Sequence, residues 1–407
     1  MNKIDRLILE LCPEGVKFLP LADVFDYRNG YTPSKSNKKH WTDGTVPWFR
    51  MDDIRENGGV LSESLQYVSK AAVKGSVFPA NSIIVATSAT IGVHALITVD
   101  FLANQRFTCL TRKASFQDKL DPVFAYYYCF LLDKWCIENT NTSSFASVNM
   151  AGFARFPFPI PPLPVQREIV RILDNFTELT AELTAELTAR NRQYEYYRNS
   201  LLSYESDSVA WMRFGKIAKI MRGASPRPIL AYMTNEDSGI NWIKIGDAKP
   251  GEKYISETQD KITVGGAEKS RYVHPGDFIL SNSMSFGRPY IMKISGCIHD
   301  GWLSISGFEK VFLRDFLYHL LSAGFVQHTM AQSASSGTVQ NLNADIVKGL
   351  LLPVPSLDEQ ARIVSILDRF DALCNDLTSG LPAEIEARRK QYEYYRDKLL
   401  TFREKAS

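Results

Sequence analysis

Apolar residues recur mostly at every third or fourth position along two long stretches of the chain. The first stretch, residues 165–204, contains no glycine or proline, and its repeating apolar residues are Ile169, Ile172, Phe176, Leu179, Leu183, Leu187, Tyr194, Tyr197 and Leu201. This spacing is typical of the seam of a coiled coil sustained over several heptads. About 40 helical residues, each rising about 1.5 Å, predict a rod about 60 Å long.

The second stretch carries the same pattern with one interruption. Ser356 and Glu359 have the spacing of a capping box, in which two side chains satisfy free backbone N–H groups at a helix start. The apolar positions that follow are Ile363, Ile366, Phe370, Leu373, Leu377, Ile385, Tyr392, Tyr395 and Leu399. The segment Gly380-Leu381-Pro382 interrupts them, which predicts that this helix bends or splits there.

The two stretches belong to a larger internal repeat. Residues 159–176 return as residues 353–370, and Gln193-Tyr194-Glu195-Tyr196-Tyr197-Arg198 returns unchanged as residues 391–396. The segments between them match more loosely, for example Gly30-Tyr31-Thr32-Pro33 with Gly223-Ala224-Ser225-Pro226. The repeat predicts a pseudo-two-fold arrangement of four regions: residues 1–158, a first globular domain; 159–206, central and helical; 207–352, a second globular domain; and 353–407, C-terminal and helical.

Two long helices separated by compact segments can pair only if the chain returns, so we expect an antiparallel coiled coil. Pairing would cover the apolar stripe that each helix otherwise exposes to water. The alternative is two solvent-exposed helices that bind a partner protein. Inside the central helix, residues 180–187 are a tandem Thr-Ala-Glu-Leu tetrapeptide. Four residues add about 6 Å and slightly more than one turn, so the number of tetrapeptides is predicted to set the length of a strut.

The two compact regions show mixed α and β patterns. Short β-type runs are predicted at Ser82–Thr87, Trp242–Ile245 and Asp277–Ser281, and helices at Phe124–Trp135 and Val311–Ser322. The predicted fold is therefore α+β, with two similar α/β-mixed domains separated by the two long helices.

The overall charge is balanced, but basic residues concentrate locally. The chain has 47 Lys and Arg against 45 Asp and Glu, a formal net charge of +2. Residues 209–235 contain five basic residues and no acidic one, and residues 28–50 contain five basic residues and only Asp43 as an acid. Such glycine-punctuated basic loops suit phosphate and base-edge contacts on duplex DNA. A solvated basic face is the alternative interpretation of each block taken alone.

Candidate DNA-binding residues follow from charge and loop position. Serine-rich loops near residues 143 and 336 are second candidates, and they are equally compatible with surface turns. Trp48 and Trp242, which align in the repeat, are predicted to be core residues. The candidate DNA-binding residues are Arg28, Asn29, Tyr31, Thr32, Lys35, Lys38, Lys39, Arg50, Asp52, Ser143, Ser144, Arg222, Ser225, Arg227, Lys244, Asp247, Ser336, Thr338 and Gln340.

Signatures of catalysis, metal binding and membrane insertion are absent from the sequence. No phosphate-binding P-loop, dinucleotide-binding or nucleophile-elbow motif occurs, nor does the Asn/Asp-Pro-Pro-aromatic motif of amino-methyltransferases. Six scattered cysteines without a C-x-x-C pair favour reduced thiols in the cytoplasm, and no catalytic or metal site is predicted. The uncharged stretch 75–99 is too polar for a spanning helix and predicts two strands.

The duplicated helical segments and the Gly30–Pro33 and Pro47-Trp48 loops resemble the specificity subunit of type I restriction–modification systems. The tetrapeptide repeats resemble its type IC subfamily. The resemblance covers essentially the whole chain. It implies two target recognition domains that read the halves of an asymmetric, interrupted DNA site, and a coiled coil that docks two modification (methyltransferase) subunits. It also implies restriction subunits as partners, with S-adenosylmethionine and ATP bound only in those partner subunits.

Two other functions are compatible with the residues alone. A duplicated coiled-coil adaptor would bind proteins and show no salt-dependent DNA affinity. A self-sufficient DNA-modifying enzyme would itself bind S-adenosylmethionine. The absence of catalytic motifs and the tandem architecture favour a non-catalytic DNA-recognition subunit.

Overall fold

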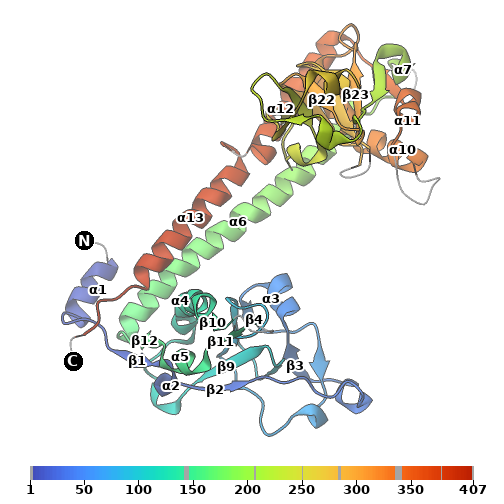
Figure 1. Ribbon diagram of the computed structural model, residues 1–407. Coiled ribbons are helices and arrows are strands. Elements are labelled where there is room, and N and C mark those ends of the chain that lie inside the picture. The colour runs from blue at the N-terminus through green and yellow to red at the C-terminus, as the bar shows by residue number, and fades with distance from the viewer. Residues whose placement is uncertain are drawn as a thin grey trace. The chain divides into compact units, whose positions relative to one another are not determined.

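The chain forms two compact units. The computed structural model describes residues 3–141, 146–205, 208–249, 251–282, 286–334, 342–376 and 378–405. Unit 1 consists of Met1–Thr180 with Arg388–Ser407, and unit 2 of Ala181–Ala387. Helices α6 (Leu163–Leu202) and α13 (Leu381–Leu399) contribute residues to both units (Figure 1).

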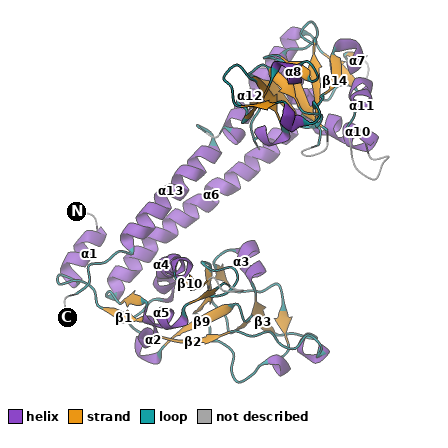
Figure 2. Cartoon of the chain, in the orientation of Figure 1, coloured by secondary structure: helices purple, strands orange, loops and turns teal. Residues whose placement is uncertain are grey.

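Unit 1 is built on a five-stranded sheet with the order β2-β9-β6-β7-β4 and a three-stranded sheet with the order β5-β3-β8, and Figure 2 shows strands in orange. Its strands are β1 (Phe18–Pro20), β2 (Phe25–Asn29), β3 (Val46–Phe49), β4 (Val60–Leu61), β5 (Tyr67–Val68), β6 (Ser82–Ala86), β7 (His94–Ile97), β8 (Leu102–Ala103), β9 (Phe107–Arg112), β10 (Thr140–Asn141), β11 (Ser147–Val148) and β12 (Pro157–Pro159). Its other helices are α1 (Lys3–Leu11), α2 (Leu21–Val24), α3 (Met51–Asn57), α4 (Pro122–Glu138) and α5 (Met150–Arg155).

Unit 2 repeats this plan, with five-stranded sheets of order β14-β23-β20-β21-β17 and β15-β18-β16-β22-β19. Its strands are β13 (Ala210–Arg213), β14 (Lys219–Arg222), β15 (Met233–Thr234), β16 (Ile240–Ile243), β17 (Tyr254–Ile255), β18 (Asp260–Ile262), β19 (Arg271–Val273), β20 (Phe278–Ser281), β21 (Pro289–Met292), β22 (Gly296–Ile298), β23 (Trp302–Ser306) and β24 (Leu351–Val354). Its helices are α7 (Phe214–Ile217), α8 (Val264–Ala267), α9 (Arg314–Leu321), α10 (Gly324–Ala334), α11 (Ala344–Gly349) and α12 (Leu357–Asn375).

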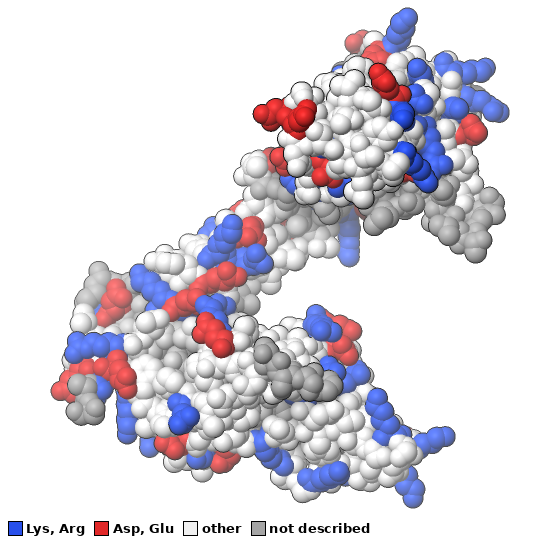
Figure 3. Space-filling model, in the orientation of Figure 1, with Lys and Arg blue, Asp and Glu red and all other residues white. Residues whose placement is uncertain are grey.

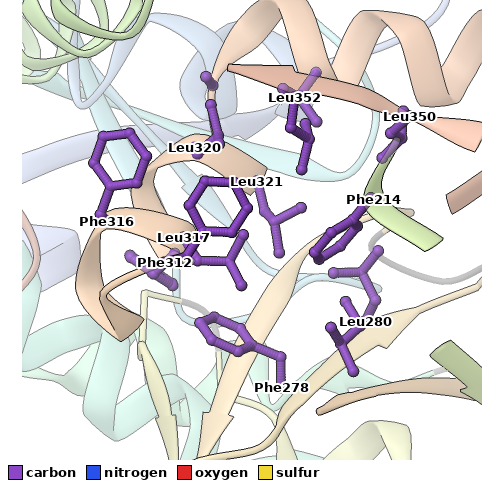
Figure 4. Close-up of a cluster of buried hydrophobic side chains, with 14 of the residues drawn as sticks. Phe214, Phe278, Leu280, Phe312, Phe316, Leu317, Leu320, Leu321, Leu350 and Leu352 are labelled. Atoms are coloured by element: carbon purple, nitrogen blue, oxygen red, sulfur yellow. The ribbon is translucent and has the colours of Figure 1, made fainter. Parts of the chain in front are cut away.

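The central strand of each main sheet is covered on both faces. In β6, Ile83 and Val85 join the core that contains α4, whereas Ile84 belongs to a second core on the other face. In β20, Phe278 joins the core that contains α9, whereas Ile279 belongs to a second core on the other face. Figure 4 shows Phe278 among the apolar side chains of unit 2. Because side chains alternate along a strand, a strand buried on both faces has no side available for Asp, Glu, Lys or Arg, which explains why β6 and β7 lie in the charge-free stretch 75–99.

A buried glutamine fixes the start of each long helical region. The Gln166 side-chain amide donates to the carbonyls of Pro161 (2.6 Å) and Lys119 (2.8 Å), and its oxygen accepts the N–H of Asp121 (2.7 Å) at the start of α4. In unit 2 the Gln360 amide donates to Pro355 (3.0 Å) and Val311 (2.9 Å) and accepts from Leu313 (2.8 Å) at the start of α9. Both glutamines are 0% exposed. Each therefore ties a coiled-coil helix to the domain beside it.

Repeated aromatic contacts pair the long helices. In unit 1, Phe176 of α6 stacks on Tyr395 of α13, with ring centroids 5.6 Å apart at 22°. In unit 2, Phe370 of α12 stacks on Tyr197 of α6 at 5.4 Å and 26°, and on Tyr194 at 6.1 Å and 12°. Phe370 is the repeat of Phe176, so each copy supplies the phenylalanine to one pair and the tyrosine to the other. Figure 1 shows α13 beside α6, and the predicted antiparallel coiled coil is confirmed.

The N-terminal and C-terminal segments belong to the same unit. The backbone N–H of Val16 donates to the carbonyl of Arg403 (2.8 Å), and the N–H of Lys405 donates to the carbonyl of Val16 (2.9 Å). Ile4 of α1 and Leu400, which follows α13, are buried in one core. Unit 1 therefore requires residues from both ends of the sequence.

Several predicted elements are confirmed, although the ends of the strands and helices predicted in the compact regions differ from the structure by up to three residues. The last helical region splits into α12 and α13 around Gly380, and Ser356 caps α12 by accepting the N–H of Glu359 at 3.3 Å. The predicted helix 311–322 begins only at Arg314, because the N–H groups of residues 311 and 312 bond to the carbonyl of Phe308 in a turn. The predicted strand 242–245 ends at Ile243, because a 3-10 turn begins at Ile245.

Replacing either buried glutamine by leucine should destabilise its unit. Gln166→Leu leaves the N–H of Asp121 and two carbonyls without their partner, and we expect the free energy of unfolding to fall by about 2–4 kcal/mol. Gln360→Leu should act in the same way. Urea denaturation measures the change. Gln117→Leu, at an exposed position of unit 1, is the control and should shift stability by less than about 0.5 kcal/mol. Equal stability of Gln166→Leu and the control would contradict the stabilising role of the buried glutamine.

Candidate nucleic-acid interface

Unit 1 contains an open cleft of about 550 Å³ beside the first sequence-predicted basic block. Its basic lining residues are Lys35, Lys38, Arg50 and Arg106, and its amide residues are Gln66, Asn104 and Gln105. None of the lining residues that the structure describes is acidic. In Figure 3, basic side chains gather at the end of unit 1 that carries the 3-10 turn Lys38–His40. The cleft thus combines positive charge with groups that can donate and accept hydrogen bonds.

The Gly30–Pro33 loop forms one wall of this cleft. The N–H of Gly30 donates to the carbonyl of Phe107 (2.9 Å), and the N–H of Tyr31 donates to the carbonyl of Ala103 (2.7 Å). A Cβ on Gly30 would collide with the carbonyl oxygens of Ala103 and Asn104, so only glycine permits this approach. Thr32, two residues after Gly30, donates its hydroxyl to the side-chain oxygen of Gln105.

Unit 2 contains an equivalent cleft of about 810 Å³ with a different lining. The N–H of Gly223 donates to the carbonyl of Trp302 (2.8 Å), and a Cβ on Gly223 would collide with the carbonyl oxygen of His299. The hydroxyl of Ser225 donates to Asp300 Oδ1 at 2.8 Å. The lining also includes Leu230, which is 84% exposed, so this cleft presents an exposed apolar side chain, whereas the lining of the first includes Lys35 and Lys38.

Carboxylates give the second cleft a different electrostatic character. Lys244 pairs with Asp260, and this hydrogen bond raises the pKa of the lysine. Asp300 Oδ1 lies 3.0 Å from His299 Nε2, and Asp300 Oδ2 lies 3.8 Å from Arg227 Nη2. Burial raises the pKa of Asp300, but the Ser225 hydroxyl and the His299 ring outweigh it and hold the pKa below its usual value. Asp300 is therefore ionised and accepts hydrogen bonds only.

The strand pairing aligns the two clefts residue by residue. Phe49 pairs with Ala103 in unit 1, and Ile243 pairs with Ile298 in unit 2. The backbone N–H of Trp48 donates to the carbonyl of Gln66, and Trp242 is the strand partner of Asp260. The corresponding lining residues are therefore Arg50 and Lys244, Gln66 and Asp260, Asn104 and His299, and Gln105 and Asp300.

The structure brings seven of the sequence-predicted residues together in the clefts. Thr32, Lys35, Lys38 and Arg50 line the first, and Ser225, Arg227 and Lys244 line the second. Lys39 is exposed outside the lining, and Asp52 pairs with Arg50 and Arg55. Ser143, Ser144, Ser336, Thr338 and Gln340 lie outside the described residues.

Other sequence-predicted residues bond within the protein. Arg28 donates to the carbonyl of Ser76 (2.7 Å) and covers the Phe78 ring at 4.1 Å. Asp247 accepts the N–H groups of Lys244 (2.7 Å) and Gln259 (3.4 Å). Three more make similar bonds. The Asn29 side-chain oxygen accepts from the Thr108 hydroxyl, and the Tyr31 hydroxyl donates to the carbonyl of Ala72. Arg222 donates to the carbonyl of Asp300.

Several cleft residues escaped the sequence analysis. They are uncharged or acidic residues, and they lie either outside the basic blocks or at uncharged positions within them: Trp41, Gln66, Asn104, Gln105, Ile229, Leu230, Asp260, His299 and Asp300; the basic Arg106 was also missed. Extending the repeat alignment through these loops is the signal that finds them. The predicted core positions of Trp48 and Trp242 are confirmed, since they are 4% and 1% exposed.

Comparison with known proteins shows the family. The type I restriction modification DNA specificity domain matches residues 13–190 and, a second time, residues 209–387. The chain therefore belongs to the family of type I restriction–modification specificity subunits. It is 43% identical over 386 residues to the type I restriction enzyme EcoprrI specificity subunit of Escherichia coli, which covers 91% of this chain and 92% of that protein. It is 36% identical over 259 residues to the EcoR124I/EcoR124II specificity subunit of Escherichia coli, covering 61% and 63%.

Solved structures agree on the fold. A chain from a study of complex assembly and conformational transition of the type I R-M system matches with a TM-score of 0.67 at 17% identity, covering 95% of this chain and 97% of that one. The HsdS subunit from Thermoanaerobacter tengcongensis matches with a TM-score of 0.50 at 17% identity, covering 95% and 97%. The predicted fold of two similar α/β-mixed domains with long helices is thereby confirmed.

The residues that the structure describes contain neither a membrane-spanning helix nor a cluster of metal-binding side chains. No helix among them is long and apolar enough to cross a membrane. Within the same residues, no group of three or more His, Cys, Asp or Glu side chains is arranged to hold a metal ion. All six cysteines are buried and free.

Proposed function

We propose that the chain is the DNA specificity subunit of a type I restriction–modification complex, in which each unit reads one half of an asymmetric bipartite duplex site. One observation carries this proposal. The two units present clefts at equivalent positions of the same fold, and the side chains that line them differ. Equivalent scaffolds with different linings are what the reading of two different half-sites requires.

The chemistry of the clefts suits duplex DNA. Lys35, Lys38 and Arg50 supply positive charge for phosphate contacts, which position a protein on DNA without reading sequence. Amide and carboxylate side chains match the donors and acceptors that base edges display in the major groove. The exposed Leu230 matches the apolar methyl group of thymine.

The helical regions carry a second kind of surface, which is the same in both copies. Tyr196 and Tyr394 occupy the same position of the identical six-residue repeat and are 68% and 62% exposed. Each packs edge-to-face on its neighbour, Tyr197 or Tyr395, at 5.5 and 5.3 Å. Exposed aromatic side chains on a rigid helix are typical anchors of protein interfaces. Two identical surfaces favour two copies of one partner, the methyltransferase subunit.

The chemistry of modification is assigned to the partners. The chain acts as a non-catalytic cytoplasmic subunit, while S-adenosylmethionine binds in the methyltransferase subunits and ATP in restriction subunits. Methyltransferases reach adenine by flipping it from the stacked duplex, and the specificity subunit places them beside the target base. An adaptor that binds only proteins leaves the basic, acid-free first cleft without a role.

Removing cleft lysines tests the proposed phosphate contacts. In the assembled methyltransferase complex, Lys35→Ala with Lys38→Ala should weaken binding equally for specific and unrelated duplexes. The slope of log K against log salt should decrease by about 0.9 for each phosphate contact that is lost. Fluorescence anisotropy at several salt concentrations measures both effects. Lys17→Ala, exposed and outside the cleft, is the control. A double variant with the salt slope of wild type would reject these contacts.

Deleting one tetrapeptide tests whether α6 sets the half-site spacing. Removal of Thr184–Leu187 shortens the helix by about 6 Å, the length of about two base pairs. We expect the methylated sequence to keep both half-sites and to lose about two base pairs between them. Sequencing of methylated genomic DNA measures this. Replacement of the same four residues by alanines keeps the length and should keep the spacing. An unchanged spacing after the deletion would refute the strut while leaving DNA recognition intact.

Single tyrosine variants should reveal two separate docking surfaces. Tyr196→Ala removes one exposed anchor, so we expect about 30-fold weaker binding of one methyltransferase subunit, as for a strong interface residue. Tyr394→Ala should affect the other subunit, and the double variant both. Native mass spectrometry at limiting concentration would show two bound subunits becoming one and then none. Tyr272→Ala, at an exposed tyrosine of β19, is the control. Full binding of two subunits by the double variant would contradict this assignment.

A further inference from the structure

The loop hydroxyl has the same partner position in both clefts. Thr32 donates to the Gln105 amide oxygen, and Ser225 donates to Asp300 Oδ1. The glycine two residues before each hydroxyl allows the loop to pack against the backbone that precedes residues 105 and 300. The Gly-x-Thr/Ser-Pro motif therefore places a hydroxyl against the side chain at one structural position, whatever that side chain is.

The residue before this position has a different role. Asn104 Oδ1 accepts the N–H of Arg106 at 2.9 Å, and His299 Nδ1 accepts the N–H of Gly301 at 2.9 Å. These side chains close the turn of their own loop in both units. Gln105 is exposed in the first cleft, and Asp300 is partly exposed in the second. A hydroxyl from another loop therefore holds the side chains of Gln105 and Asp300 at the cleft. The side chains before them, Asn104 and His299, bond within their own loop.

We propose that Gln105 and Asp300 occupy one reading position, oriented by the hydroxyls of Thr32 and Ser225, and determine which base is accepted at the corresponding place in each half-site. This inference rests on the proposed function. It goes further, because it assigns specificity at one base pair in each half-site to one residue and a positioning role to the hydroxyl beside it.

The two side chains select different bases. An amide donates and accepts, so Gln105 can form two hydrogen bonds with adenine N6 and N7. Its oxygen has a second lone pair after accepting from Thr32. A carboxylate only accepts, which suits the N4 amino group of cytosine. Asp300 Oδ2 is 3.8 Å from Arg227, longer than a hydrogen bond, so it is the oxygen that accepts from the base. The first domain should therefore read adenine and the second cytosine at this place.

Reciprocal isosteric variants test the assignment in the assembled methyltransferase complex. Gln105→Glu should change the preferred base at one position of the first half-site from adenine to cytosine, by about 5- to 150-fold in relative methylation rate. Asp300→Asn should change one position of the second half-site in the opposite sense. In each variant the other half-site should stay unchanged. Sequencing of methylated DNA, followed by rate measurements on duplexes varied at that position, gives the result.

Matched controls isolate the position within each domain. Gln117→Glu and Asp237→Asn make the same chemical changes at exposed positions outside the clefts and should leave the methylated sequence unchanged. Wild-type base preference in both Gln105→Glu and Asp300→Asn would overturn the proposal. If a variant complex methylates nothing, competition binding among duplexes varied in one half-site decides: loss of preference at one base pair supports the proposal, and full wild-type preference overturns it.

Removing the hydroxyls distinguishes positioning from simple loop packing. Thr32→Val should relax base preference at the same position that Gln105→Glu changes, and Ser225→Ala should do so for Asp300. If the hydroxyls only tie loops together, these variants lower the melting temperature and leave base preference intact, which would overturn the positioning role. Failure of the wild-type complex to methylate any bipartite sequence would instead reject the proposed function, so the two failures are distinguishable.

Discussion

The arrangement of each unit depends on one buried amide group. Gln166 and Gln360 each connect a long helix to the start of a domain helix through two hydrogen bonds, and a third hydrogen bond holds the segment just before the long helix. A polar group with no access to water has to find its partners within the protein, so its geometry is strict. The aromatic stack between the long helices adds a second fixed relation. Domain and helix are consequently held as one body within each unit, and a cleft on the domain keeps a defined orientation to its own part of the coiled coil.

The same fixed scaffold supports surfaces of two kinds. The exposed tyrosines of the helices are identical in both copies, whereas the cleft positions are chemically different. Phe176 and Phe370 show why the helices resist divergence, since each fills a space shaped by the tyrosines of the other copy. Gln105 and Asp300 lie at loop ends, where a change of side chain disturbs little packing. The two copies therefore differ at these cleft positions, which lie outside the apolar cores.

The helices and the tandem plan could be predicted from the sequence because apolar periodicity reflects burial directly. Ile363 and Phe370 pack against the core of unit 2, and their spacing predicted which side of the helix faces it. The domain boundaries at residues 158, 206 and 352 stay predictions, because the compact units divide the long helices between them. Gln105 and Asp300, the proposed reading positions, were missed for a different reason. A glutamine in a polar loop has no periodicity, and the repeat offset changes from 194 at Gln66 to 195 at Gln105, which hides the correspondence. Arg28 and Asp247 show the converse, since local charge density does not distinguish a side chain that faces solvent from one that bonds to the backbone.

The pairing of Val16 with residues 403–405 has a consequence for biosynthesis. Unit 2 is one continuous segment, so all of its residues are synthesised in a single stretch. Unit 1 is divided, and Ile4 with its apolar neighbours lacks the cover of Leu400 until the residues after α13 have been synthesised. Residues 3–11 therefore reach their native environment later than the segments that follow them, and loss of α13 together with Leu400 would expose the core of unit 1 more than the core of unit 2.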